Sequence, residues 1–375
     1  MNRIILFPLY FLLLLSTPRS VFSDCPEAAK LFAKGVELSD GSKAEEGYYR
    51  KAISLCPNMA EAYYNLGVVL AKRGDYASAM DSYKKAVELF PKGIYYTAIG
   101  NLKLQMKDYS AAKEAYNKAL EMDPKDSDAL QGLSVVYNHL GLYTKAESVL
   151  RKALELQGDS AAINYNLGVV LEKQNKIIDA ITAYENAISI DDRHFAAHFY
   201  LGLAYQKTGR YEDSKKVLER AATLQPEWAS VYRALAVTYE KLGDFERAEM
   251  ALKKALKLEP DYVPSLTNLG IILLSKTNPN PLEAEAVLQE AVKKDATNSR
   301  ALTALGWAQI ELGRNQQAEN SLRRAIELDG TNAYAYNTLG VLYYRMGRSE
   351  DAEEAFKKAV SLNPEIARLN KRVNH

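Results

Sequence analysis

The chain has 375 residues, with 48 Lys and Arg against 47 Asp and Glu, and 47% of its residues are hydrophobic. This composition excludes collagen-like and disordered chains, and a net charge of +1 gives no electrostatic footprint for nucleic acid or anionic membranes. Two Cys and four His exclude a disulfide-dense scaffold and a His-rich metal array. At about 150 residues per domain, length alone predicts two or three domains.

The first 23 residues have the pattern of an export signal. Arg3 gives a positive start, an apolar run extends from Ile4 to Leu15, and a more polar stretch ends at Ser23. Small residues at the −3 and −1 positions favour cleavage after Ser23. The apolar run is too short to cross a bilayer of roughly 30 Å. We expect an exported protein without an integral membrane span.

Two other readings of this segment remain open. The signal could stay uncleaved as an anchor, or Cys25 could be lipidated as in bacterial lipoproteins, although Asp24 stands where those proteins carry a small residue. The expected location is a bacterial periplasm, envelope or cell surface, or the secretory pathway if the source is eukaryotic.

From residue 26 the chain repeats itself ten times. Asn-Leu-Gly recurs at 65–67, 166–168 and 268–270, and eight of the ten units have 34 residues. A fixed period of this length indicates a repeat array and not separate globular domains. Hence one solenoid at 26–366 replaces the two or three domains that length suggests, and a short tail follows at 367–375. The units are 26–59, 60–92, 93–126, 127–160, 161–194, 195–228, 229–262, 263–298, 299–332 and 333–366.

The residue pattern of each unit predicts a pair of helices. Position 27 is Ala in all ten units, position 8 is Gly in seven, and position 24 is always Tyr, Leu or Phe. Small residues at 8, 20 and 27 let helices approach closely, and the large residue at 24 fills the space between them. Apolar residues recur at helical spacing, and Pro at position 32 in six units ends the second helix.

This pattern resembles the tetratricopeptide repeat family over residues 26–366. The resemblance implies an all-α fold, a right-handed superhelical solenoid of about ten helix–turn–helix units with a concave groove lined by the first helices. Two units depart from the pattern. The first has Glu45 at position 20, and the eighth carries 277–281 between its helices, where Asn280 can cap and Pro281 can begin the second helix.

The two cysteines fall at neighbouring ends of the first hairpin. Cys25 precedes its first helix and Cys56 ends its second, and these ends lie together in an antiparallel pair. Because an exported compartment permits disulfides, we predict a Cys25–Cys56 bond that contributes roughly 3 kcal/mol. Two free thiols are the alternative.

The family resemblance also implies partner-binding positions on the first helices. Aromatic and Arg side chains are frequent binding anchors, and Asn amides can hydrogen-bond a peptide backbone. The competing interpretation of each residue is an ordinary packing or solvated role. Thr97 and Gln105 occupy such positions in the third unit. The predicted partner-binding groove contains Tyr64, Asn65, Asn101, Tyr165, Asn166, Phe199, Arg233, Asn268, Trp307, Asn337 and Tyr344.

Motifs for catalysis do not occur in the sequence. It contains no Gly-rich phosphate loop, no His-Glu-x-x-His, no Cys-x-x-Cys and no Gly-x-Ser-x-Gly. His194 and His198 stand four apart, but two nitrogens without a third ligand make a weak metal site. We therefore expect no catalytic residues, no cofactor and no metal.

The expected function is that of an exported scaffold that binds peptide segments of partner proteins in its groove, in envelope assembly or secretion. The alternative is a targeting or regulatory subunit for an envelope enzyme or for a glycan or polysaccharide export system. The expected partners are proteins or peptides and not nucleic acid. Self-association through the C-terminal end is a further possibility.

Overall fold

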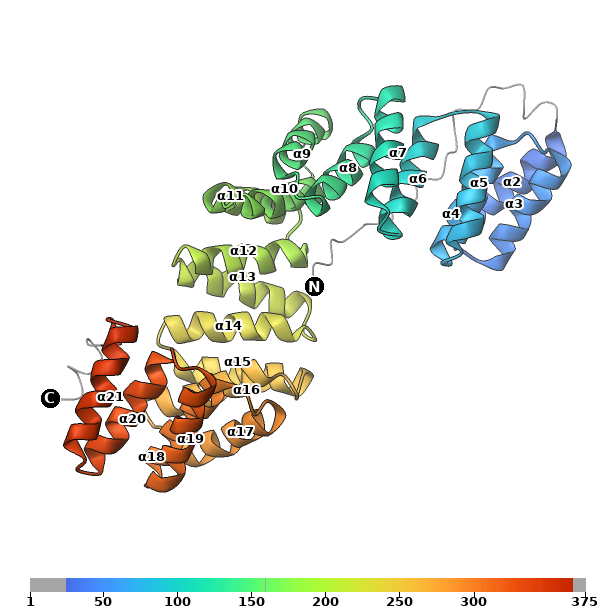
Figure 1. The fold of residues 1–375 in the computed structure, drawn as a ribbon. Coiled ribbons are helices and arrows are strands. Elements are labelled where there is room, and N and C mark those ends of the chain that lie inside the picture. The colour runs from blue at the N-terminus through green and yellow to red at the C-terminus, as the bar shows by residue number, and fades with distance from the viewer. Residues whose placement is uncertain (1–24, 159, 367–375) are drawn as a thin grey trace. The chain divides into compact units, whose positions relative to one another are not determined.

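The computed structural model describes residues 25–158 and 160–366, which form helical hairpins throughout (Figure 1). The predicted export signal at 1–23 and the tail at 367–375 lie outside the described residues. The chain divides into two compact units, Met1–His194 and Phe195–His375, and each holds five hairpins. The predicted all-α solenoid of helix–turn–helix repeats is confirmed.

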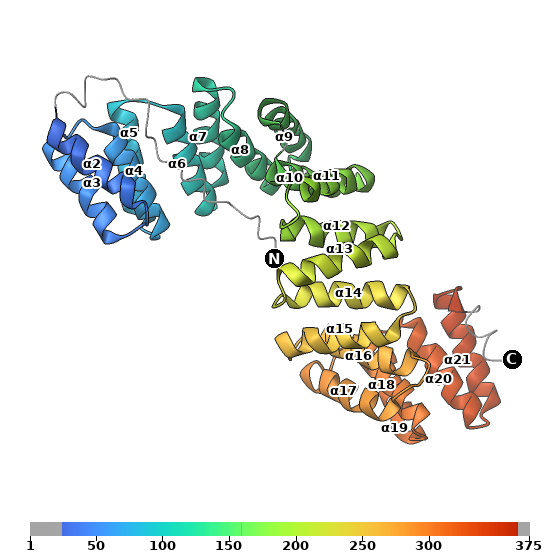
Figure 2. The same ribbon diagram turned by 180° about the vertical axis from the view of Figure 1, so that it is seen from behind.

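The first unit contains the hairpins of repeats one to five. Neighbouring first helices contact one another, as α4 with α6, α6 with α8 and α8 with α10, so they form one face of the unit (Figure 2). The hairpins are α2 (Pro26–Leu38) with α3 (Lys43–Leu55), α4 (Ala60–Lys72) with α5 (Tyr76–Leu89), α6 (Gly93–Gln105) with α7 (Tyr109–Met122), α8 (Ser127–His139) with α9 (Tyr143–Gln157), and α10 (Ala161–Lys173) with α11 (Ile177–Ile190).

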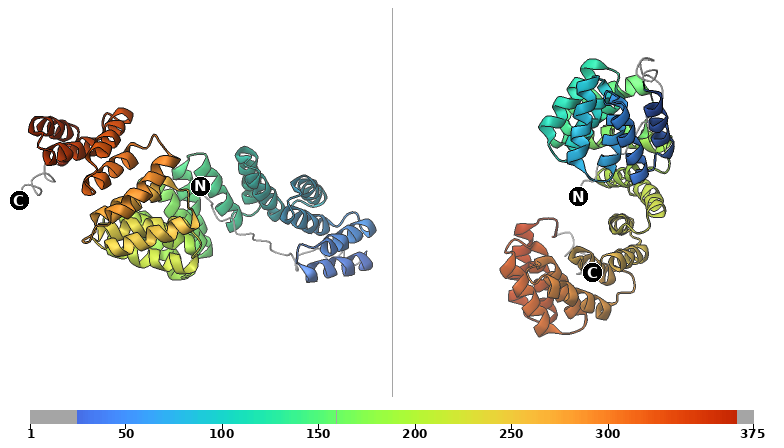
Figure 3. Two further views of the ribbon diagram at one scale, coloured as in Figure 1. Left: turned by 90° about the horizontal axis from the view of Figure 1, so that it is seen from below. Right: turned by 90° about the vertical axis from the view of Figure 1, so that its right-hand side faces the viewer.

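The second unit contains repeats six to ten in the same arrangement (Figure 3). Here α12 contacts α14, α16 contacts α18, and α18 contacts α20. The hairpins are α12 (Phe195–Lys207) with α13 (Tyr211–Leu224), α14 (Ala229–Lys241) with α15 (Phe245–Leu258), α16 (Val263–Ser275) with α17 (Pro281–Lys294), α18 (Ser299–Glu311) with α19 (Asn315–Leu328), and α20 (Ala333–Arg345) with α21 (Ser349–Leu362).

A left-handed residue ends the first helix of most repeats. In the second repeat Gly74 has φ +82°, and the Asp75 amide bonds back to the Leu70 carbonyl at 2.9 Å, as in a Schellman motif. Lys107 and Asn175 take the same position in repeats three and five, both at φ 61°. The left-handed conformation is less favourable for Lys than for Gly or Asn.

The eighth repeat replaces this turn with a longer one. Its first helix ends at Ser275, and Asn280 caps α17 by accepting the Glu283 amide at 3.2 Å. Pro281 occupies the first turn of α17, as the sequence predicts.

Close helix contact explains the small residues of the repeat. The alanines at position 27 are all buried, at 0 or 1% exposure. A Cβ added to Gly100 would lie 2.6 Å from the Tyr116 ring, and one added to Gly132 would lie 2.3 Å from the same ring. Tyr116 is therefore held between the first helix of its own repeat and that of the next.

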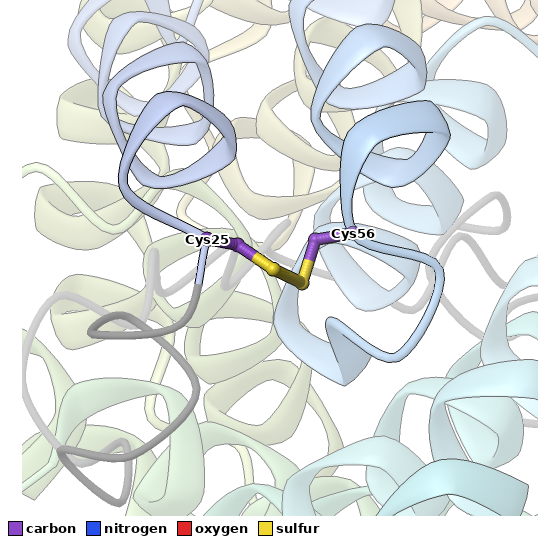
Figure 4. Close-up of a disulfide and its surroundings, with 2 residues drawn as sticks. All are labelled: Cys25 and Cys56. Carbon is purple, nitrogen blue, oxygen red and sulfur yellow. A yellow bond between two sulfur atoms is a disulfide. The ribbon is translucent and has the colours of Figure 1, made fainter.

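The first hairpin is tied at its open end. Cys25 and Cys56 form a disulfide with a Cα–Cα distance of 6.1 Å (Figure 4). Nearby, the exceptional Glu45 is 2% exposed and accepts hydrogen bonds from the Gly41 amide at 2.7 Å and from the Tyr49 hydroxyl at 3.3 Å. A buried carboxylate thus takes the place of the usual Ala, with one donor from the wider turn of this hairpin and one from α3.

Glutamates at position 21 join neighbouring repeats. Glu147 pairs with Arg151 of its own helix at 2.8 Å and with Lys176 of the next repeat at 2.9 Å. These hydrogen bonds, the one from Lys176 first, lower the pKa of Glu147 to about 2. The same role falls to Glu46, Glu249 and Glu319.

Candidate functional site

Three residues of the predicted groove are buried in the core. Tyr64 and Tyr165 are 4% exposed and Asn65 is 2% exposed, so a partner cannot reach most of their surface. The Tyr64 side chain is long enough to contact both the second helix of its own repeat and the first helix of the following repeat. The Tyr64 ring lies 5.9 Å from Tyr83 and 5.0 Å from Tyr95. Their expected role as exposed anchors is therefore corrected to packing.

Tyr165 and its neighbour Asn166 lie further along the first unit. The Tyr165 ring is 6.0 Å from Tyr184 and 5.0 Å from His194, whereas Asn166 is half-buried. His194 thus packs against an aromatic ring, and His198 is also buried in the second unit. Within the described residues, no three His, Cys, Asp or Glu side chains come together as a metal site.

In the second unit the predicted residues are spread over several helices. Arg233 pairs with Glu259 at 2.7 Å and stacks 4.2 Å above the Tyr262 ring, so its charge is already used internally. Phe199 stacks on Phe195 with 6.2 Å between centroids. Three further predicted residues of this unit are half-buried: Asn268, Trp307 and Asn337.

Asn268 and Asn337 each have a buried amide oxygen, Oδ1, without a hydrogen-bond donor among the described residues. Tyr344 differs, because it is 63% exposed and lines a mostly apolar hollow with Phe356 and Val360 on the last hairpin.

A pocket in the first unit brings predicted groove residues together. It is formed by α4, α5, α6 and α8 and is a small hollow with a cavity volume of about 70 Å³. Tyr64 contributes to its floor and Asn101 to its wall. The lining residues are Tyr64, Val68, Ala71, Tyr83, Ile94, Thr97, Ala98, Asn101, Leu102, Gln105 and Asp128.

Amide side chains occupy the wall contributed by α6. The buried Tyr116 hydroxyl donates a 2.6 Å hydrogen bond to Oδ1 of the exposed Asn101, whereas Nδ2 of Asn101 bonds to no described residue. Gln105 Nε2 donates to the Tyr76 hydroxyl at 2.7 Å. Each amide is thus oriented by a hydrogen bond to a tyrosine hydroxyl, and the Asn101 amide nitrogen can donate to a ligand.

The start of α8 contributes negative charge. Asp126 caps this helix through the Ala129 amide at 2.9 Å and accepts from the Thr97 hydroxyl at 2.6 Å. Asp128 lines the pocket, and no described residue bonds to its carboxylate. Burial, and then the charge of Asp126, raise the pKa of Asp128. Asp128 was not among the predicted groove residues, although it lies on a first helix, where those residues are expected.

Comparisons with known proteins agree with the repeat architecture. The family model described as the C-terminal domain of cilia and flagella-associated protein 70 matches residues 164–373, more than half of the chain. Two tetratricopeptide repeat models match residues 60–92 and 103–165. A comparison with curated protein sequences finds no match.

Two solved structures share the fold, and a third matches with a lower TM-score. The C-terminal part of a repeat protein from Cytophaga hutchinsonii is 16% identical, with a TM-score of 0.55 over 65% of this chain and 99% of that one. PilF of Pseudomonas aeruginosa is 20% identical, with a TM-score of 0.50 over 54% of this chain and 92% of that one. YrrB is 26% identical, with a TM-score of 0.44 over 50% and 97%.

No helix within residues 25–158 and 160–366 combines the length and apolar character of a membrane span. The repeat spacing, the buried alanines and the matching family models lead to one conclusion. The chain belongs to the tetratricopeptide repeat family of protein-interaction scaffolds.

Proposed function

We propose that this protein is an exported scaffold whose first unit binds a peptide segment of a partner protein. The observation that carries the proposal is the pocket between α4, α6 and α8. It combines an apolar floor with the amides of Asn101 and Gln105, which suits the alternating apolar and polar surface of an extended peptide.

Export is supported by the first hairpin. Disulfides persist in oxidising compartments, and the Cys25–Cys56 bond is of that kind. A Cys25 sulfur held in a disulfide is not available for lipidation. We place the protein in a bacterial periplasm, envelope or cell surface, where it serves envelope assembly or secretion. Delivery of an envelope enzyme or of a glycan-export component is the second candidate, and it would use the same pocket.

The pocket can be tested by filling it with a larger side chain. A phage-displayed library of random linear peptides is selected on the full chain, and the affinities of the selected peptides are measured by fluorescence anisotropy. Replacing the partly exposed Ala98 by Trp fills the pocket, so we expect binding to weaken about tenfold or more, the effect of losing one anchor contact.

The matched control is Ala77→Trp, because Ala77 is exposed on α5 and does not line the pocket. Its affinity should equal that of the wild type. Peptides that bind Ala98→Trp as tightly as the wild type would place the binding surface elsewhere. Substituting Tyr64 or Tyr165 is not a useful test, since both are core residues.

A further inference from the structure

The pocket of the first unit is lined by an acidic side chain and by no basic one. Among its lining residues Asp128 is charged, and none is Lys, Arg or His. No ion pair or hydrogen bond from a described residue engages the half-buried Asp128 carboxylate, whereas a more buried acid of the same unit is paired. That acid, Glu61, is 6% exposed and is paired with Lys92 at 2.8 Å.

Asp126 strengthens the negative potential at this end of the pocket. Its oxygens are already engaged by the Thr97 hydroxyl and the Ala129 amide. Those donors are neutral, so only the positive end of the α8 dipole compensates the carboxylate charge, and no cationic side chain does. Two neighbouring carboxylates without a cation repel each other, and an incoming positive charge would relieve that repulsion.

The rest of the lining suits the stem of a basic side chain. Val68, Ala71, Ile94 and Leu102 provide an apolar path between α4 and α6. Lys and Arg side chains place their methylene groups along such surfaces while the charged end reaches a polar group. Asn101, also in the lining, can donate its amide hydrogens to the backbone carbonyl groups of the same peptide.

We propose that the pocket recognises a Lys or Arg side chain of the bound peptide, with its stem against α4 and α6 and its cationic end at Asp128. This inference rests on the proposed function, because it specifies the class of peptide that the first unit takes. We do not expect an acidic peptide to bind here, because it would bring negative charge close to Asp128 and Asp126.

The test uses the peptides selected on the full chain. In each peptide, Lys is replaced by norleucine or Arg by citrulline, which removes the charge and keeps the size. On the protein, Asp128→Asn removes the carboxylate charge, and Asp179→Asn is the control, an exposed first-turn acid of α11 outside the pocket. Thermal melting checks that both variants stay folded.

We expect Lys or Arg at one position of most selected peptides. Removing either charge should weaken binding about tenfold, as expected for a charged hydrogen bond, and removing both should cost little more. Asp179→Asn should bind as the wild type. Peptides that bind equally well after norleucine or citrulline replacement, or that bind Asp128→Asn unchanged, overturn the inference and leave the proposed function standing. A chain that selects no peptide overturns both.

Discussion

The Tyr116 hydroxyl donates a 2.6 Å hydrogen bond to Oδ1 of Asn101, and this bond joins the core of the first unit to the wall of its pocket. The Tyr116 side chain is fully buried, whereas Asn101 is exposed. Gly100 and Gly132 leave room for the ring on either side. The position of a candidate binding residue is thus determined by packing beneath it.

The two ends of this bond should respond differently to substitution. Tyr116→Phe leaves an acceptor that water can reach, so we expect a loss of about 1 kcal/mol of unfolding free energy. Asn101→Leu leaves the buried hydroxyl without a partner, and the loss should reach about 2 kcal/mol. Urea denaturation of both variants measures the difference. Equal losses, or a larger loss for Tyr116→Phe, would contradict the asymmetry.

Glycine substitutions test the close approach of the helices. Gly132→Ala places a methyl group 2.3 Å from the Tyr116 ring, so overpacking should destabilise the protein by about 1–3 kcal/mol. Gly47→Ala is the matched change, because no atom lies within 4 Å of its added Cβ in α3. It should stabilise α3 by about 0.5–1 kcal/mol through helix propensity. Thermal melting that shows the same sign for both would refute this packing account.

Loss of the disulfide should act locally. Cys25→Ser with Cys56→Ser opens a loop spanning 31 residues, and the first hairpin should lose about 3 kcal/mol of stability. Since each repeat contacts only its neighbours, amide hydrogen exchange should accelerate in α2 and α3 and stay unchanged in α12 to α21. Alkylation and mass spectrometry of the unreduced protein provide the control. Two alkylatable thiols there would show that the bond does not form.

Acid should weaken the contact between repeats four and five. Glu147 has a folded pKa of about 2 against an ordinary 4.5, because Lys176, Arg151 and Gln174 hold its charged form. A lowered carboxylate pKa contributes stability above the unfolded pKa and loses it as pH falls through the folded one. Glu147→Gln should therefore cost about 1 kcal/mol at neutral pH and almost nothing near pH 2. A cost that does not depend on pH would contradict the ionic role of Glu147.

The repeat architecture could be predicted from the sequence because small residues at fixed positions allow neighbouring helices to pack closely. The alanines from Ala52 to Ala359 at position 27 are buried wherever they occur. The cap at Asn280 and the pairing of Cys25 with Cys56 also follow from local order along the chain.

The candidate site was harder to predict, since burial depends on neighbouring repeats. The predicted groove residues lie on the first helices, yet a tyrosine there can reach the next repeat and become buried, as Tyr64 does against Tyr95. Asp128 escaped notice because an acid in the first turn of a helix has an ordinary stabilising role. Only the pocket around it reveals that its carboxylate lacks a cation.

The central claim is that the first unit binds a peptide between α4, α6 and α8, and methyl NMR tests it most directly. Ala71, Ile94 and Ala98 line the pocket and carry methyl groups that can be labelled in the full chain. On titration with a selected peptide, these three signals should shift together, and the methyl groups of Ala333 and Ala355 in the second unit should not. Shifts confined to the second unit, with Ala71, Ile94 and Ala98 unchanged, would contradict the account.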